Sequence, residues 1–158
     1  MSEQDGNSRR PAEGELAPDF QAHAQGRDVS LGALRGRSRA AVFFYPLAFT
    51  PVCRAELPEL EKCAPRYTER GCAIFAISVD HQASANAFAE FCGITSFPVI
   101  GDWSKAIVTA YGVLREEGFS DRASFLVDRG GIIRFIQRNE LMLKRDFSEL
   151  LPRLDKID

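Results

Sequence analysis

The stretch Phe44-Tyr45-Pro46-Leu47-Ala48-Phe49-Thr50-Pro51-Val52-Cys53-Arg54-Ala55-Glu56 joins an apolar run to a helical pattern, and the expected fold is built around it. The apolar run, Ala40–Tyr45, is typical of a strand that is covered on both faces of a parallel sheet. After the stretch, apolar residues recur at spacings of three and four, the period of one helix face: Leu57, Leu60, Ala64 and Tyr67. The stretch therefore lies at the carboxyl edge of a sheet, where open α/β folds place their chemistry.

Further along the chain the same patterns recur. We expect, in order, a strand at Cys72–Val79, a helix with Ala87, Phe88 and Phe91 on one face and its end near Gly93, a short segment at Phe97–Ile100, a helix around Lys105–Tyr111, strands at Ala123–Val127 and Ile132–Gln137, and a last helix face of Phe147, Leu150, Leu151 and Leu154. Residues 128–131, Asp-Arg-Gly-Gly, are a hairpin signal, and Pro152 should kink or shorten the last helix. This order predicts an α/β fold, a thioredoxin-like sandwich with a central mixed β-sheet flanked by helices.

Length and composition limit the function. With 158 residues, 45% hydrophobic and 27% charged, the chain reads as one soluble domain. Twenty Lys and Arg against twenty-two Asp and Glu argue against nucleic acid as the main partner, and no apolar stretch approaches the ~20 residues that span a membrane. The polar N-terminus lacks the apolar segment of a secretory signal. We expect residues 1–14 to be a disordered lead-in and residues 15–158 to form the domain.

The four cysteines contain no C-x-x-C pair, which argues against a thioredoxin-type dithiol, a zinc ribbon and an iron–sulfur site. Two histidines are too few for a His-rich metal site, and reduced thiols predict a cytoplasmic protein. Three of the cysteines have no cap motif before them and are interpreted as small buried hydrophobes: Cys63, Cys72 and Cys92.

Cys53 differs because a helix start precedes it. Thr50 is a good N-cap and Pro51 is preferred at the first helical position, so Cys53 is the third helical residue. There the unpaired N–H groups and the positive end of the helix dipole favour a thiolate. Thr50-Pro51 could also be only a cap. Pro58 cannot donate to the Arg54 carbonyl, which predicts either a weakly held first turn or a harmless kink.

These residues resemble a known family. Pro46-x-x-x-Thr50-x-x-Cys53 is similar to the signature of the peroxiredoxins, thiol peroxidases of thioredoxin-like fold. The resemblance spans about residues 15–138, and it is carried by further segments: residues 16–20, 76–80, 97–98 and 122–131. Ala110–Val113 through Arg122 to Phe135 is most similar to the one-cysteine alkyl hydroperoxide reductase E group.

The resemblance implies a role for each matching residue. Cys53 would attack the peroxide and become a sulfenic acid, and Thr50 would hydrogen-bond the peroxide. Pro46 would shield the sulfur from water, and Arg122 would pair with the thiolate and polarise the peroxide. Glu56 would orient the arginine. The substrates implied are hydrogen peroxide and organic hydroperoxides, with no metal, flavin or nucleotide cofactor.

Departures from the family pattern bear on how the sulfenic acid is reduced. Arg54 stands where the family often has proline, and its charge either assists the thiolate or faces solvent. Pro58 occupies the position of a second cysteine in members that resolve within the helix, and no cysteine follows Cys92. An external thiol or a thioredoxin- or glutaredoxin-like reductant is therefore expected. Cys72 or Cys92 as the resolving cysteine, after local unfolding, stays an open alternative. A homodimer packed near the active-site loop is the expected assembly.

Two alternative functions also stay open on the same fold. A peroxide sensor or relay, or a chaperone-like assembly, would be distinguished by its lack of steady-state turnover. A thiol–disulfide oxidoreductase is disfavoured by the missing second cysteine of a dithiol.

Overall fold

Five strands form the central sheet of the computed structural model, which describes residues 10–158. The strands are β3 Arg39–Phe44, β4 Cys72–Ser78, β5 Val99–Gly101, β6 Arg122–Val127 and β7 Ile133–Asn139, in the spatial order β5-β4-β3-β6-β7. Strands β3, β4 and β5 run parallel, whereas β6 and β7 pair antiparallel as a hairpin. The predicted mixed sheet of a thioredoxin-like fold is thereby confirmed.

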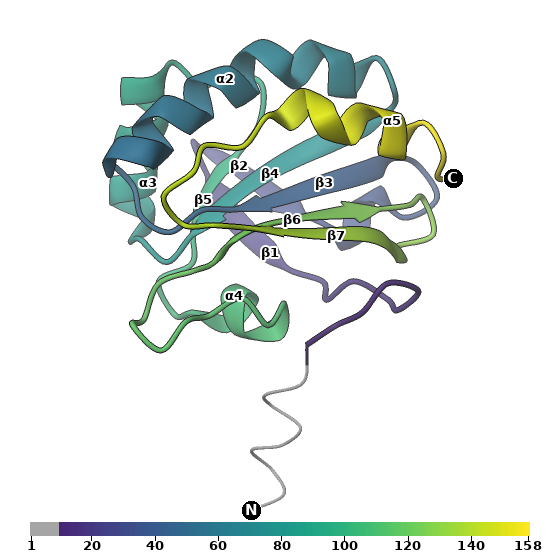
Figure 1. Cartoon of the computed structure of the whole chain (residues 1–158), viewed down its shortest axis with the longest axis horizontal. Coiled ribbons are helices and arrows are strands. Elements are labelled where there is room, and N and C mark those ends of the chain that lie inside the picture. The colour runs from purple at the N-terminus through teal and green to yellow at the C-terminus, as the bar shows by residue number, and fades with distance from the viewer. Residues whose placement is uncertain (1–9) are drawn as a thin grey trace, which may run out of the picture.

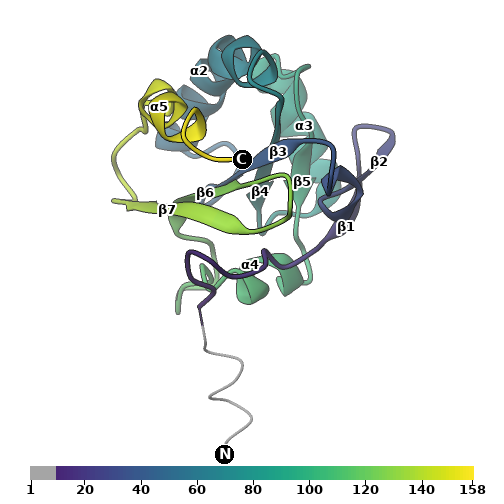
Figure 2. The ribbon, with the colours of Figure 1, turned by 90° about the vertical axis from the view of Figure 1, so that its right-hand side faces the viewer.

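Helices cover both faces of this sheet (Figures 1 and 2). The helical elements are α2 Pro51–Thr68, α3 Gln82–Cys92, α4 Ala106–Ala110 and α5 Leu151–Leu154, with 3-10 turns η1 Gly32–Leu34 and η2 Phe147–Leu150. Helices α2, α3 and α5 lie on one face, and α4 lies on the other with a small two-stranded sheet of β1 Gln21–Ala24 and β2 Arg27–Ser30. The sequence patterns did not predict this small sheet, because its strands are short and mostly polar.

Alternating side chains of the central strands supply two cores. In β3, Ala41 and Phe43 belong to the apolar cluster beneath α2, α3 and α5, whereas Ala40, Val42 and Phe44 belong to the cluster on the other face. This alternation is the two-residue period of a strand buried on both sides. The buried strand sets the direction in which the following residues, 45–50, leave the sheet.

Two helices differ in detail from the predicted patterns. In α3 the buried residues are Ala85, Phe88 and Ala89, while Phe91 is 60% exposed, so the predicted face was wrong by part of a turn. Phe91 contacts the ring of Phe49 instead, at 5.5 Å between centroids. The last helix is split into η2 and the short α5, as the position of Pro152 predicts.

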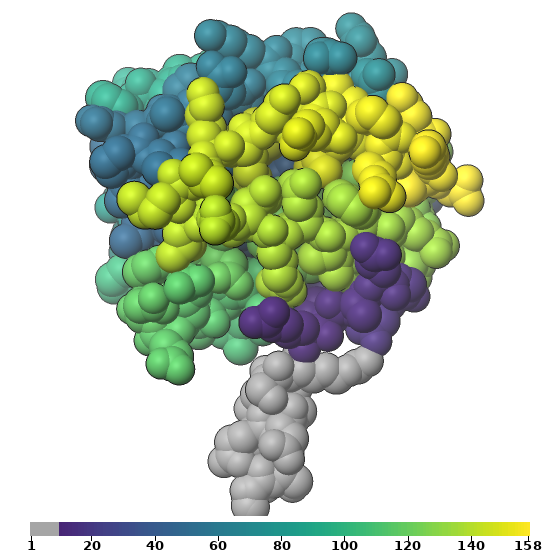
Figure 3. Space-filling view, viewed as in Figure 1, coloured from purple at the N-terminus to yellow at the C-terminus, as the bar shows by residue number. Residues whose placement is uncertain are grey.

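The chain enters the domain beside the β6–β7 hairpin. Most of the predicted disordered lead-in, residues 1–9, lies outside the described residues. Within the described part, Gly14 N–H donates to the Ile133 carbonyl at 2.8 Å, and Figure 3 shows the purple residues after the grey trace resting against the hairpin. In residues 10–158 we find no helix with the length and apolar character needed to cross a bilayer.

Candidate active site

Helix α2 begins where the sequence predicts, with Cys53 as its third residue. Thr50 has the extended backbone of an N-cap, and Pro51 opens the helix. The Thr50 hydroxyl, however, caps no helical N–H, because it donates to the Leu47 carbonyl at 2.7 Å. Its proton is therefore committed within the loop, while its oxygen lone pairs remain able to accept from a bound molecule.

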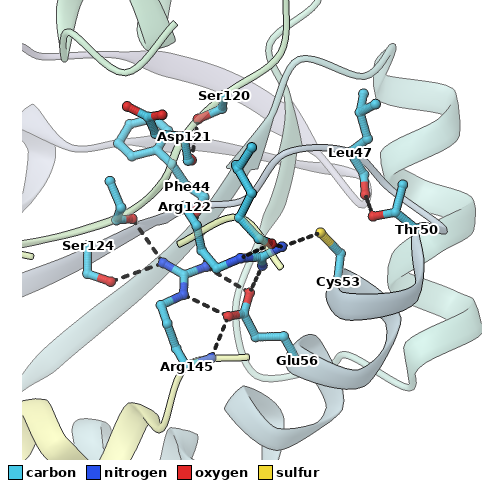
Figure 4. A network of polar contacts seen from close by, with 12 residues as sticks. Phe44, Leu47, Thr50, Cys53, Glu56, Ser120, Asp121, Arg122, Ser124 and Arg145 are labelled. Carbon is cyan, nitrogen blue, oxygen red and sulfur yellow. Dashed lines mark hydrogen bonds and ion pairs between the residues drawn. The ribbon is translucent and has the colours of Figure 1, made fainter. Parts of the chain in front are cut away.

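Arg122 reaches the Cys53 sulfur from the first position of β6. Because β6 pairs with β3, its first residue lies beside the carboxyl end of β3, from which the chain turns into α2. Arg122 Nη2 lies 3.6 Å from Cys53 Sγ, and the two residues are 2% and 0% exposed (Figure 4). The buried sulfur therefore faces a permanent positive charge.

Two further groups fix the orientation of the Arg122 guanidinium. Nη1 donates to Glu56 Oε1 at 2.7 Å, and Nε and Nη2 donate to the Leu141 carbonyl at 3.1 and 2.8 Å. Glu56 lies three residues after Cys53 in α2, so both project from one side of the helix. Leu141 belongs to the segment after β7, which Figure 3 shows in yellow-green at the surface, between blue α2 and the green residues before β6. Arg122 is thus held from two sides.

Arg145 is the functional candidate that sequence reasoning missed. Its Nε and Nη2 donate to the two oxygens of Glu56, each at 2.8 Å, and its backbone N–H donates to Glu56 Oε2 at 3.0 Å. Its remaining donors reach the carbonyls of Ala123 and Phe44 and the hydroxyl of Ser124, each at 3.0 Å. The guanidinium also lies over the rings of Phe43 and Phe147. Glu56 is therefore shared by two buried arginines (Figure 4).

The sequence around Arg145 contains one usable signal. Asp146 and Ser148 form a helix start, and the Asp146 carboxylate does accept the Ser148 N–H. That signal would place Arg145 just before a helix. It would not show that the side chain turns inward, because most arginines lie at the surface.

Charge in this network is unbalanced. Burial alone would raise the pKa of Glu56, but the hydrogen bonds and charge of Arg145, followed by the charge of Arg122, lower that pKa below its usual value. Glu56 is therefore an anion, and the network carries two guanidiniums and one carboxylate. The surplus is one positive charge, and Arg122 presents it to Cys53. A thiolate at Cys53 would neutralise the site.

A cavity of about 290 Å³ adjoins this network. Pro46, Thr50 and Arg122 contribute to its lining, together with the apolar side chains of Phe119, Leu141 and Met142. Pro46 itself is buried at the end of β3. A small molecule in the cavity would lie against Arg122 and Thr50. Cys53 is fully buried and does not line the cavity, and its sulfur lies behind the Arg122 guanidinium at 3.6 Å.

The other three cysteines lack such a setting. Burial raises the pKa of Cys63, and it raises the pKa of Cys72 to about 12. Burial and, next, the charge of Cys53 raise the pKa of Cys92 to about 11. Arg54 is exposed at the helix surface. Within residues 10–158, no group of three or more His, Cys, Asp or Glu side chains is arranged to hold a metal ion.

Comparisons with known proteins agree in both sequence and fold. The sequence profile of the AhpC/TSA family matches residues 14–136. The chain is 38% identical over 131 residues to alkyl hydroperoxide reductase E of Mycobacterium tuberculosis, covering 80% of this chain and 85% of that protein. It is 33% identical over 154 residues to alkyl hydroperoxide reductase C of Helicobacter pylori, covering 90% and 78%. The reduced 2-Cys peroxiredoxin of Plasmodium vivax superposes with a TM-score of 0.82 at 30% identity, over 90% of this chain and 80% of that chain.

Proposed function

Because the chain belongs to the AhpC/TSA family of peroxiredoxins and alkyl hydroperoxide reductases, it is a thiol-dependent peroxidase, and we propose that Cys53 is the residue that attacks the peroxide. The observation that carries this proposal is the surplus positive charge that Arg122 presents 3.6 Å from the Cys53 sulfur. Among the four cysteines, Cys53 alone combines a guanidinium contact with the first turn of a helix.

The reaction follows from this geometry. The Cys53 thiolate attacks one peroxide oxygen, so an S–O bond forms as the O–O bond breaks and the sulfur loses two electrons to the peroxide. The hydroperoxide proton ends on the leaving oxygen, which departs as water or an alcohol. Cys53 is left as a sulfenate, which takes up a proton to become a sulfenic acid.

Fixed donors stabilise the charge that spreads onto the two oxygens in the transition state. Arg122 donates to the peroxide from Nη2, and its carbonyl and carboxylate partners prevent it from reorienting during the reaction. The Thr50 oxygen accepts the hydroperoxide proton as a hydrogen bond, since its own proton is directed to Leu47. Pro46, buried beside the cavity, keeps water from the sulfur.

The sulfenic acid is reduced by an external thiol or by a thioredoxin- or glutaredoxin-like protein in this proposal. The chain offers little support for a partner cysteine within α2, because Cys63 follows ten residues later in the same helix. At ~1.5 Å per residue their α-carbons are about 15 Å apart, which exceeds the ~7 Å limit of a disulfide. The substrates are hydrogen peroxide and organic hydroperoxides. The apolar wall of the cavity can contact the organic group of a hydroperoxide.

We also propose a cytoplasmic homodimer. Phe49 in the active-site loop and Phe91 at the end of α3 are both exposed and touch each other, which supports a contact between two copies there. Sedimentation of the reduced protein tests the assembly: a monomer at micromolar concentration contradicts it. Cell fractionation tests the location.

Mass spectrometry tests the chemistry. Reduced protein is treated with one equivalent of hydrogen peroxide in the presence of dimedone, which traps sulfenic acids. We expect a single adduct on the peptide that contains Cys53, and none after Cys53→Ser. An intramolecular disulfide in place of the adduct would contradict the external-thiol cycle, and an adduct on another cysteine would contradict the assignment of Cys53.

A further inference from the structure

Asp80 anchors the loop that carries Thr50, although it follows a different strand, β4. It lies two residues beyond the end of β4, beside the point where residues 45–50 leave β3. Its Oδ2 accepts the backbone N–H of Ala48 at 2.8 Å and the hydroxyl of Ser78 at 2.6 Å. The carboxylate therefore connects the end of β4 to the middle of the active-site loop.

The bond to Ala48 acts on the same peptide group that holds Thr50. The Ala48 N–H and the Leu47 carbonyl belong to one planar unit, in which the two groups point in opposite directions. Asp80 binds the N–H side, and the Thr50 hydroxyl donates to the carbonyl side at 2.7 Å. An anion on the N–H also polarises the peptide and strengthens its carbonyl as an acceptor. The direction of the Thr50 hydroxyl is therefore linked to Asp80 through one rigid group.

The Asp80 backbone is itself tightly placed. Asp102 N–H donates to the Ser78 carbonyl at 2.6 Å, which fixes the end of β4 against the segment after β5. Gly101 lies against the Asp80 carbonyl so closely that a Cβ at this position would collide with it. If the Leu47–Ala48 peptide were displaced, Asp80 could not move with it without disturbing β5.

We propose that Asp80 is a positioning residue for peroxide reduction, which acts by fixing the Leu47–Ala48 peptide and thereby aiming the Thr50 oxygen at the peroxide. This inference rests on the proposed role of Cys53 and Thr50. It does not involve contact between Asp80 and the substrate. If Asp80 acts only through Thr50, its removal matters only while Thr50 has a hydroxyl to aim.

A double-mutant cycle tests this dependence. The second-order rate constant with hydrogen peroxide is measured for the wild type, Asp80→Ala, Thr50→Val and the double variant. We expect Asp80→Ala to lower the rate constant about 10- to 100-fold in the wild-type background, the range for a misplaced reacting group. In the Thr50→Val background the same change should cost less than about threefold, the coupling expected of groups in one network. Equal losses in both backgrounds would overturn the proposal.

Alkylation of Cys53 by iodoacetamide, followed on the Cys53 peptide, gives a readout that does not use the Thr50 oxygen. Asp80→Ala should leave this rate within about twofold, as expected of groups that are not coupled. A fall that matches the loss in peroxide rate would mean that Asp80 only maintains the local fold, and would overturn the proposal. Asp80→Asn keeps an oxygen acceptor for the Ala48 N–H, so it should recover most of the peroxide rate. If Asp80→Ala does not fold, Asp80→Leu, which is similar in size and has no acceptor for the Ala48 N–H, replaces it in the cycle.

Asp128 supplies a matched control at the other end of the sheet. Its carboxylate also accepts backbone N–H groups in a turn, those of Gly130 and Ile132, but it lies in the β6–β7 hairpin. Asp128→Ala should leave the peroxide rate unchanged, and a loss equal to that of Asp80→Ala would overturn the specific role of Asp80. A wild-type Cys53 that does not react with peroxide would instead refute the proposed function itself.

Discussion

Cys53 and Cys72 lie near opposite ends of helix α2, and both are almost completely buried, at 0% and 4% exposure. Cys53 lies in the first turn, among N–H groups without helical partners and beside Arg122. Cys72 follows the helix, on the side of its free carbonyls, where the helix dipole disfavours an anion. Burial raises the pKa of Cys72 to about 12, and Arg39 offsets this only in part. We therefore expect burial to make a thiol inert unless a cation is buried in contact with its sulfur.

The arginines near the two cysteines differ in where their donors are directed. Arg39 uses its donors on the carbonyls of Arg70 and Ile157, which tie the start of β3 to the C-terminus. Arg122 also binds a carbonyl and a carboxylate, but it shares that carboxylate with Arg145. One positive charge therefore remains at the Cys53 end of the helix.

The largest expected difference in peroxide consumption is between serine substitutions of the two cysteines near the ends of α2. Cys53→Ser removes the nucleophile and should abolish peroxide consumption. Cys72→Ser should consume peroxide at the wild-type rate wherever the variant is folded. Both are measured as hydrogen peroxide loss with dithiothreitol as reductant, after circular dichroism verifies folding. Residual turnover of Cys53→Ser that disappears on a second cysteine substitution would assign the reaction to that other thiol.

Removing the surplus charge should have the next largest effect. In Arg122→Gln the remaining pair, Glu56 and Arg145, is neutral, and the peroxide loses a fixed donor. We expect the second-order rate constant to fall about 10²- to 10³-fold, as for the loss of one transition-state donor. Arg122→Lys restores the charge without the forked geometry. Its rate constant should therefore lie between those of the wild type and Arg122→Gln. Stopped-flow measurement at pH 7 checks the order.

Arg115 is the control for this series, because it is an arginine paired with Glu117 and Asp121 at the surface. Arg115→Gln should change the peroxide rate constant very little. A loss equal to that of Arg122→Gln would mean that general electrostatics, rather than the buried network, sets the reactivity.

Stability should depend on Glu56 more than on any surface carboxylate. Glu56→Gln leaves two buried guanidiniums without an anion and should lower the free energy of unfolding by about 3–5 kcal/mol. Protonation of Glu56 in acid should also lower the free energy of unfolding. Because the pKa of Glu56 is lower in the folded state, its stabilisation is complete above the ordinary pKa near 4.5 and is lost as the pH falls through the folded value. Urea titrations at pH 7 and pH 3 should therefore show a smaller wild-type advantage over Glu56→Gln at pH 3.

The surface carboxylate Glu117 provides the comparison for Glu56. Its pKa is also lowered, by a hydrogen bond from Arg115, but the pair is exposed. Solvent screens an exposed pair, so it contributes little to stability. Glu117→Gln should thus have little effect at either pH, and a loss as large as that of Glu56→Gln would contradict the assignment of the stability to burial.

The same contrast separates what sequence patterns predicted from what they did not. The position of Cys53 follows from local rules, because Thr50 and Pro51 begin a helix after a buried strand. Arg122 was assigned by resemblance, since its meeting with Cys53 depends on the pairing of β6 with β3. Arg145 had no comparable signal. Its burial depends on where the segment after β7 crosses α2, and only the folded chain specifies that crossing.

Local rules were also incomplete within the loop. Thr50 occupies the predicted N-cap position, but its hydroxyl donates to Leu47 rather than accepting a helical N–H. The competing acceptor, the Leu47 carbonyl, belongs to a peptide group whose N–H donates to Asp80, and Asp80 follows a separate strand. A rule that considers neighbouring residues alone cannot include that partner.

The smallest expected effect concerns Cys72 as a thiol. With a pKa of about 12 it is almost entirely protonated at pH 8, so it should not react with iodoacetamide in the native state. Labelling then requires opening of the region around β4, a central strand of the sheet. If that opening is global unfolding, the labelling rate should rise with urea with the slope of the equilibrium unfolding curve. Cys53 labelling should be nearly independent of low urea. A Cys72 rate equal to that of Cys53 in native buffer would show that burial without a cation does not silence a thiol, and the contrast between the two ends of α2 would fail.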